Sequence, residues 1–172
     1  MNTKELDGYL KFLSEKQTAV QESGFDVEDS DLSPQLFPFQ KYCVKRALKV
    51  GRFAMFEDCG LGKTYQQLEW AQQVVNHINK PVLILAPLDV IGQTIKEGVH
   101  FGYKVTEIAL TTFDQDLAAG IYITNYDNMD NIDAYLFGGV VLDESSILKN
   151  FAGKTRTALI EDFKNTPYKL CC

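Results

Sequence analysis

The chain has 172 residues, of which 45% are hydrophobic and 23% charged, and its formal net charge is −6. This composition is typical of one globular domain and excludes collagen, coiled coils and intrinsically disordered proteins. The longest apolar stretch, residues 81–88, is much shorter than the roughly 18–20 residues that cross a bilayer. The amino terminus lacks the basic patch and apolar run of a secretory signal, so we expect no membrane and a cytoplasmic protein.

The first 35 residues are predicted to form an N-terminal helix and an acidic linker. Residues 6–20 space their apolar side chains as a short amphipathic helix does. Residues 17–40 then hold five acids and no Lys or Arg, so a solvated linker is expected there. The main domain is predicted to extend from residue 36 to residue 172.

The next predicted helix, residues 41–52, carries five basic residues and no acid. Val44, Ala47 and Leu48 would share one side of it, while the basic side chains would gather on the other. Such a basic face is either a solvated surface or a phosphate contact, and the solvated surface is the more common of the two.

From Arg52 onward, short apolar runs alternate with helical stretches, which is typical of an α/β fold with a parallel sheet between helices. The clearest helix is residues 64–79. Six strands are predicted, at residues 53–56, 82–86, 105–110, 121–124, 140–142 and 168–172.

A glycine-rich segment follows the first predicted strand and opens the helix at residue 64. It reads Cys59-Gly60-Leu61-Gly62-Lys63-Thr64. In such a loop, backbone N–H groups turn toward a phosphate, the lysine reaches the terminal phosphates and the threonine hydroxyl binds Mg²⁺. Glu57 stands where the usual pattern has Gly or Ala. A second Gly-Lys-Thr, residues 153–155, has no strand before it and is predicted to be an ordinary helix start.

An acidic pair, Asp143-Glu144, ends the predicted strand 140–142. Chemistry in α/β proteins takes place at the carboxyl ends of such strands. Asp143 would hold Mg²⁺ and Glu144 would polarise the attacking water, which makes Lys63, Asp143 and Glu144 the candidate catalytic residues. Upstream, the Gln40 side chain could bond both the donor and the acceptor on the exposed edge of adenine.

Together these segments resemble the first motor domain of superfamily two helicases, especially the Swi/Snf-type and their phage relatives, over residues 36–172. Phe39-Gln40 lies where that family has its adenine-reading glutamine, residues 58–64 are similar to its phosphate loop, and residues 143–146 match its DExx box. The resemblance implies a RecA-like, P-loop domain of a bacterial or phage-infected cell. It also implies ATP and Mg²⁺ as cofactors and nucleic acid, with DNA expected first, as the partner.

Two shorter matches to this family lie at the ends of the second and fourth predicted strands. Residues 85–88 and 123–126 are similar to turns that contact the nucleic-acid backbone in the family. The resemblance therefore implies contacts from Pro87, Leu88, Thr124 and Asn125. The alternative is that these turns are ordinary helix starts.

The family continues, after the strand that corresponds to residues 168–172, into further motifs and a second motor domain with arginine fingers. In the family, this strand lies between the phosphate-loop strand and the strand of the acidic pair. The resemblance therefore implies a truncated motor domain that hydrolyses almost no ATP alone and shares its nucleic-acid cleft with a missing second domain. Two alternatives stay open: another P-loop ATPase, such as a packaging motor, and a non-catalytic fragment that binds nucleotide or a partner.

Overall fold

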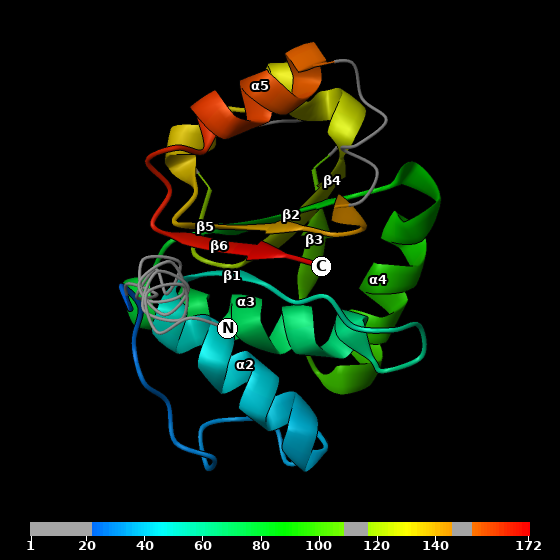
Figure 1. Cartoon of the computed structure of the whole chain (residues 1–172). Coiled ribbons are helices and arrows are strands. Elements are labelled where there is room, and N and C mark those ends of the chain that lie inside the picture. The colour runs from blue at the N-terminus through cyan, green and yellow to red at the C-terminus, as the bar shows by residue number, and fades with distance from the viewer. Residues whose placement is uncertain (1–21, 109–116, 146–152) are drawn as a thin grey trace, which may run out of the picture.

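The computed structural model describes residues 22–108, 117–145 and 153–172. Its centre is a sheet of six strands, all parallel, in the order β1-β6-β5-β2-β4-β3 (Figure 1). The strands are β1 (Arg52–Ala54), β2 (Val82–Ala86), β3 (Val105–Glu107), β4 (Ile121–Asn125), β5 (Gly139–Leu142) and β6 (Tyr168–Cys171). This sheet confirms the predicted α/β fold, and β6 lies between β1 and β5 as the resemblance implies.

Helices cover both faces of the sheet (Figure 1). One face packs against α2 (Pro38–Val50), α3 (Lys63–Ile78) and α4 (Leu88–Phe101). The other face packs against α5 (Gly153–Asp162) and two 3₁₀ helices, η1 (Tyr126–Asn131) and η2 (Ala134–Leu136). The result is the three-layer arrangement of a RecA-like domain.

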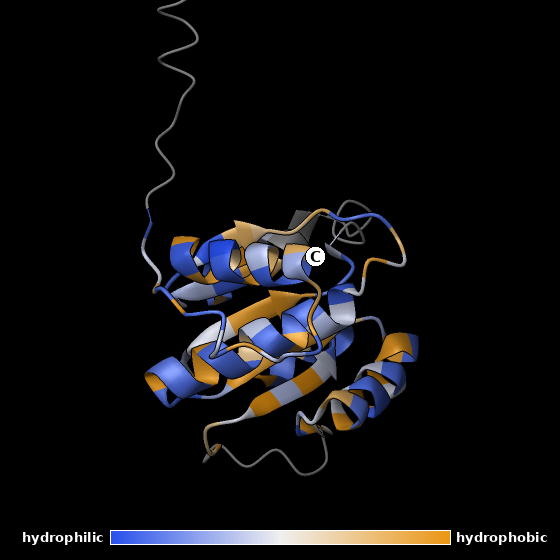
Figure 2. Ribbon diagram, turned by 90° about the horizontal axis from the view of Figure 1, so that it is seen from below, coloured by the Kyte–Doolittle hydropathy of each residue, from blue (hydrophilic) through white to orange (hydrophobic). Residues whose placement is uncertain are grey.

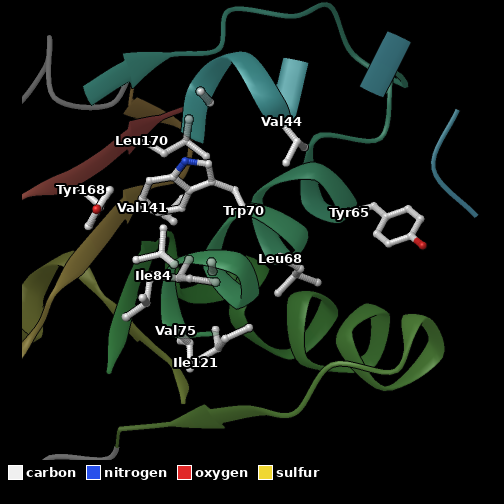
Figure 3. Packing of buried hydrophobic residues seen from close by; sticks show 14 of the residues in the cluster. Val44, Tyr65, Leu68, Trp70, Val75, Ile84, Ile121, Val141, Tyr168 and Leu170 are labelled. Atoms are coloured by element: carbon white, nitrogen blue, oxygen red, sulfur yellow. The ribbon is translucent and has the colours of Figure 1, made fainter. Parts of the chain in front are cut away.

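The two faces of the sheet bury alternate side chains, because successive strand residues point in opposite directions. On β2, Val82 and Ile84 join the core under α3, whereas Leu83 and Leu85 join the core under η1 and α5. Trp70 lies at the centre of the first core with no exposed surface (Figure 3). Figure 2 shows the same division by hydropathy: the strands are largely apolar, while the helices alternate apolar and polar residues.

Most predicted elements are present, and their ends differ by one to three residues. Helix α2 begins at Pro38, three residues earlier than predicted, because proline fits the first turn of a helix. Strand β1 ends at Ala54, and Phe56 beyond it is 82% exposed. Strand β3 ends at Glu107, and the end of the predicted strand, residues 109–110, lies outside the described residues. So does the predicted helix 6–20, whereas α5 begins at Gly153 as expected.

The acidic segment, residues 22–31, keeps its five acids exposed and is hydrogen-bonded to the main domain. It runs along the end of α2, where the backbone N–H groups of Ser23, Gly24 and Phe25 donate to the carbonyls of Val50, Lys49 and Leu48 at 3.1–3.2 Å. Just beyond the segment, Leu32 and Leu36 are buried in the main core. The packing of residues 22–35 is thus continuous with that of residues 36–172.

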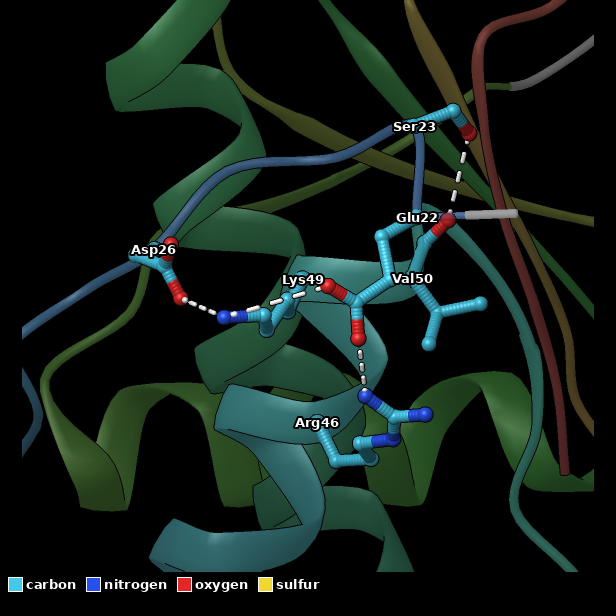
Figure 4. Close-up of polar contacts among 6 residues, drawn as sticks. All are labelled: Glu22, Ser23, Asp26, Arg46, Lys49 and Val50. Atoms are coloured by element: carbon cyan, nitrogen blue, oxygen red, sulfur yellow. Dashed lines mark hydrogen bonds and ion pairs between the residues drawn. The ribbon is translucent and has the colours of Figure 1, made fainter. Parts of the chain in front are cut away.

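The basic face of α2 is partly exposed, as expected, and is also paired with this acidic segment (Figure 4). Arg46 lies 2.5 Å from a Glu22 carboxylate oxygen. Lys49 lies 3.1 Å from an Asp26 carboxylate oxygen. Lys45 and Asp29 form a further pair at 2.7 Å. These contacts leave little free positive charge on α2 for a phosphate.

Candidate active site

The glycine-rich loop joins β1 to α3 and has the backbone conformation that its sequence predicts. Gly60 (φ +84°) and Gly62 (φ +75°) both adopt the left-handed region, which glycine enters at little cost. Gly62 precedes the first residue of α3, and among the described residues no side chain caps this helix end. The first N–H groups of α3 therefore remain available to an anion, and the helix dipole favours negative charge there.

Lys63 lies against the loop that precedes it. Its Nζ donates to the Glu57 carbonyl oxygen at 2.8 Å, with the Asp58 carbonyl oxygen at 3.5 Å. The Glu57 carboxylate accepts a hydrogen bond from Gln66 Nε2 of α3 at 2.6 Å. The acid that replaces the usual first glycine therefore fastens the loop to α3.

The acidic pair follows β5 in a tight turn. The Asp143 N–H donates to the Leu85 carbonyl at 2.8 Å, and the Glu144 N–H donates to the Asp143 carboxylate at 3.1 Å. Glu144 has a φ of +50°, a conformation that a non-glycine residue keeps only where the surrounding structure enforces it. Residue Cys172 holds the turn from the other side, because its carbonyl accepts from the Ser145 N–H at 2.8 Å.

Lys63, after the loop, and Glu144, of the acidic pair, line one cavity at the carboxyl edge of the sheet. The cavity has a volume of about 330 Å³ and contains Lys63 and Glu144 in its lining. The end of β6 is hydrogen-bonded to the segments on both sides of the cavity. The Met55 N–H donates to the Cys171 carbonyl at 2.7 Å, and the Ser145 N–H donates to the Cys172 carbonyl. The remaining lining residues are Met55, Phe56, Glu57, Ser145 and Cys172.

Burial raises the pKa of the Asp143 carboxyl above its ordinary value, and the Glu144 charge acts in the same direction. The Gln67 side chain, the Glu144 N–H and the Lys63 charge act against this increase. A further cation beside Asp143 would stabilise its charged form. The Asp143 carboxylate and the Thr64 hydroxyl are oxygen ligands of the kind that Mg²⁺ prefers, so the donor set fits this ion.

A second cavity, of about 450 Å³, lies on the other side of the loop. Phe37, Phe39, Gln40, Leu61 and Phe101 are among its lining residues. Gln40 is 4% exposed. Its Oε1 accepts from the Phe37 N–H at 2.9 Å, and its Nε2 donates to the Leu61 carbonyl at 2.8 Å. The Gln40 side chain, which is predicted to recognise the adenine base, thus also connects α2 to the loop. These two bonds use one of its two N–H groups and one of the two lone pairs of its oxygen.

The residues predicted to contact nucleic acid lie side by side, because Ala86 pairs with Asn125 in neighbouring strands. Leu88, the first residue of α4 after Pro87, is 68% exposed. Thr124 is buried instead, and its Oγ1 donates to the Ile108 carbonyl at 3.2 Å. Asn125 accepts the Asn128 N–H at 3.0 Å and so shapes the turn.

Tyr126 is the residue that sequence reasoning missed. It is buried on η1, and its hydroxyl donates to the Asp143 carbonyl oxygen at 2.7 Å. In the sequence, it is only the last residue of a turn similar to a family motif. A buried tyrosine directly after a strand end is a weak signal, since its partner stands 17 residues later.

This sheet order, with helices on both faces, is that of the expected RecA-like α/β fold. The chain is similar to the UvsW helicase from bacteriophage T4, with a TM-score of 0.66 and 16% identity over 99% of this chain and 59% of that one. A second T4 UvsW structure has a TM-score of 0.63 and 17% identity, over 77% of this chain and 28% of that one. These likenesses confirm the expected fold.

A third similar structure is the Sulfolobus solfataricus SWI2/SNF2 ATPase core in complex with dsDNA. Its TM-score is 0.63 and its identity 20%, over 84% of this chain and 33% of that one. The chain thus spans 59% of the first of these structures and about a third or less of the other two. No protein-family model and no curated protein sequence matches it. Among the helices described, none combines the length and apolarity needed to cross a bilayer.

Proposed function

We propose that this domain binds ATP with Mg²⁺ and hydrolyses it to drive movement along nucleic acid, with DNA as the first candidate. The observation that carries the proposal is the cavity lined by both Lys63 and Glu144. These residues lie far apart in the sequence, and the fold brings them together at one cavity. A lysine facing an acid at the end of parallel strands is suited to phosphoryl transfer to water.

Each candidate site residue has a defined task in this proposal. The N–H groups at the start of α3 bind phosphate oxygens, and Lys63 exchanges its bond to the Glu57 carbonyl for one to the terminal phosphate. Thr64 and Asp143 would hold Mg²⁺, which neutralises phosphate charge when bound. Glu144 orients and polarises the attacking water. The second cavity, beside Gln40, Phe37 and Phe39, would take the adenine base.

The nucleic acid would lie along the same edge of the sheet, at the adjacent turns after β2 and β4. Pro87, Leu88, Thr124 and Asn125 are the proposed contacts, through the backbone where the side chain is buried. A second motor domain, which the resemblance implies, would close the cleft and supply an arginine. Loss of such an arginine lowers turnover by about 10³- to 10⁵-fold, so we expect the 172 residues assayed alone to bind ATP and turn it over very slowly.

The test is calorimetric titration of the chain with ATP and Mg²⁺, for the original protein and for Lys63→Ala. The variant loses charge-assisted hydrogen bonds to phosphate, so its affinity should fall by about 10- to 100-fold. Lys154→Ala is the matched control, because Lys154 stands in the second Gly-Lys-Thr, at the start of α5. Equal losses in the two variants, or no binding by the original chain, would contradict the proposal.

A parallel assay of ATP hydrolysis with and without DNA separates a nucleic-acid motor from other ATPases. ATP turnover by a motor domain should respond to DNA. ATP turnover that ignores DNA would favour another P-loop ATPase.

A further inference from the structure

The side chain of Tyr126 spans the end of a strand to reach the acidic pair. Tyr126 follows β4 directly, whereas Asp143 follows β5, and β2 lies between these two strands. The hydroxyl of Tyr126 nevertheless donates to the Asp143 carbonyl oxygen at 2.7 Å. This contact joins the two strand ends above β2.

The contact fixes the peptide that carries the Asp143 side chain. The N–H of Asp143 is held by the Leu85 carbonyl at 2.8 Å, and its carbonyl is held by Tyr126. With both ends of the residue fixed, the carboxylate has little freedom except rotation of its own bonds. The tyrosine hydroxyl is the donor in this bond, because a carbonyl oxygen can only accept.

The other end of Tyr126 belongs to a turn that is itself closely bonded. Asn128 donates its N–H to Asn125 Oδ1 and its Nδ2 to Thr124 Oγ1, both at 3.0 Å. Thr124 and Asn125 are the residues proposed above to lie next to nucleic acid. A displacement of this turn, residues 124–128, would therefore be transmitted to Asp143 through the Tyr126 side chain.

We propose that Tyr126 is a positioning residue that links the turn 124–128 to Asp143 and so sets the affinity of the site for magnesium-bound nucleotide. The inference rests on the proposed function, because it assigns Asp143 to Mg²⁺. It goes further by naming the connection through which the nucleic-acid side of the domain acts on the metal side. Tyr126 itself touches neither ATP nor nucleic acid in this scheme.

The test uses Tyr126→Phe in the full chain, which removes only the hydroxyl and keeps the buried ring. ATP affinity is measured by calorimetry with Mg²⁺ and again with EDTA. We expect the Mg²⁺-dependent affinity to fall by about 3- to 10-fold, the size of one lost hydrogen bond, and the affinity in EDTA to stay within about twofold. Amide hydrogen exchange of residues 143–145 should also be faster, a readout that needs no nucleotide.

Tyr122→Phe is the matched control. Tyr122 lies on β4, the strand that Tyr126 follows, and its hydroxyl donates to a backbone carbonyl, that of Ala118, at 3.1 Å. This variant loses the same group away from the acidic pair, so both affinities should be unchanged. Equal effects in the two tyrosine variants, or equal losses with Mg²⁺ and with EDTA in Tyr126→Phe, would reveal a general loss of structure and overturn the inference.

Asn128→Ala loosens the turn from its far side. It should lower the Mg²⁺-dependent affinity selectively, and the double variant with Tyr126→Phe should be no weaker than Tyr126→Phe alone, because both act through one connection. Additive losses would overturn the link to the turn. If the original chain binds ATP and Tyr126→Phe binds it equally well, only this inference fails. If the original chain binds no ATP, the proposed function fails and this inference with it.

Discussion

Asp143 shows how a half-buried acid in a candidate site can lower the stability of the fold. Its pKa is raised mainly by burial, so the folded protein holds the charged carboxylate at a cost. Functional residues commonly impose such a cost, and replacing them often stabilises a protein. The Lys63 charge favours the ionised form of Asp143, and a bound cation would favour it as well.

We therefore predict that Asp143→Asn is more stable than the original chain at pH 7 in EDTA, by about 1 kcal/mol, or about 2–4 °C in Tm. Below pH 3.8, the ordinary value, the carboxyl is protonated both folded and unfolded, so this advantage disappears. The stability advantage of Asp143→Asn grows as the pH rises from 3.8 through the raised pKa of Asp143. Thermal unfolding at several pH values measures it, and an advantage that persists at pH 3 would contradict the explanation.

The types of the site residues were predictable from sequence, but their contacts were not. Gly60 and Gly62 both have a left-handed backbone conformation, which explains why these positions of the loop carry glycine. The bonds of Gln40 to Phe37 and Leu61, and that of Tyr126 to Asp143, depend on how the elements pack. No local pattern contains that information.

Among the elements, the acidic segment 22–31 makes more contacts with the domain than its composition suggests. A run of acids is normally solvated, but here the compensating cations stand on α2, 16 to 24 residues further along the chain. A pattern within one segment of the sequence does not show that these acids and cations pair. Pro38 and the alternating apolar runs, by contrast, are local signals, and the elements that they predict are present.

Gly24 allows the segment to lie this close to α2. A Cβ there would come within 1.8 Å of the Leu48 carbonyl oxygen. We predict that Gly24→Ala lowers the free energy of unfolding by about 1–3 kcal/mol, because the segment must move away from α2.

The control for this prediction is Gly92→Ala. Gly92 lies within α4, and a Cβ there would meet nothing within 4 Å. Alanine favours a helix interior, so this variant should gain up to about 1 kcal/mol. Urea unfolding compares the two, and a neutral Gly24→Ala would show that the segment contributes little to stability.

At the scale of the whole molecule, β6 holds the two halves of the site together. It pairs with β1 on one side and β5 on the other. Leu170, in the middle of β6, is completely buried in the core that also contains Trp70. The strand order was predictable only through the resemblance, because periodicity identifies strands but says nothing of their neighbours.

Leu170→Ala should therefore lower the free energy of unfolding by about 2–5 kcal/mol, through lost burial and the cavity that it leaves. Ile160→Ala is the comparison, since Ile160 on α5 is 57% exposed and should cost much less. The fluorescence of Trp70, the single tryptophan, reports unfolding in urea. Similar losses in both variants would argue against a central part for β6.

The position of β6 also bears on how the polypeptide assembles during translation. Strand β1 is made early, yet its hydrogen-bonding partner in the sheet is not synthesised until residues 168–171. A ribosome-bound nascent chain must therefore carry an unpaired β1 for more than a hundred codons. Exposed strand edges of this kind invite aggregation, so chaperone binding during synthesis would be of direct benefit to this protein.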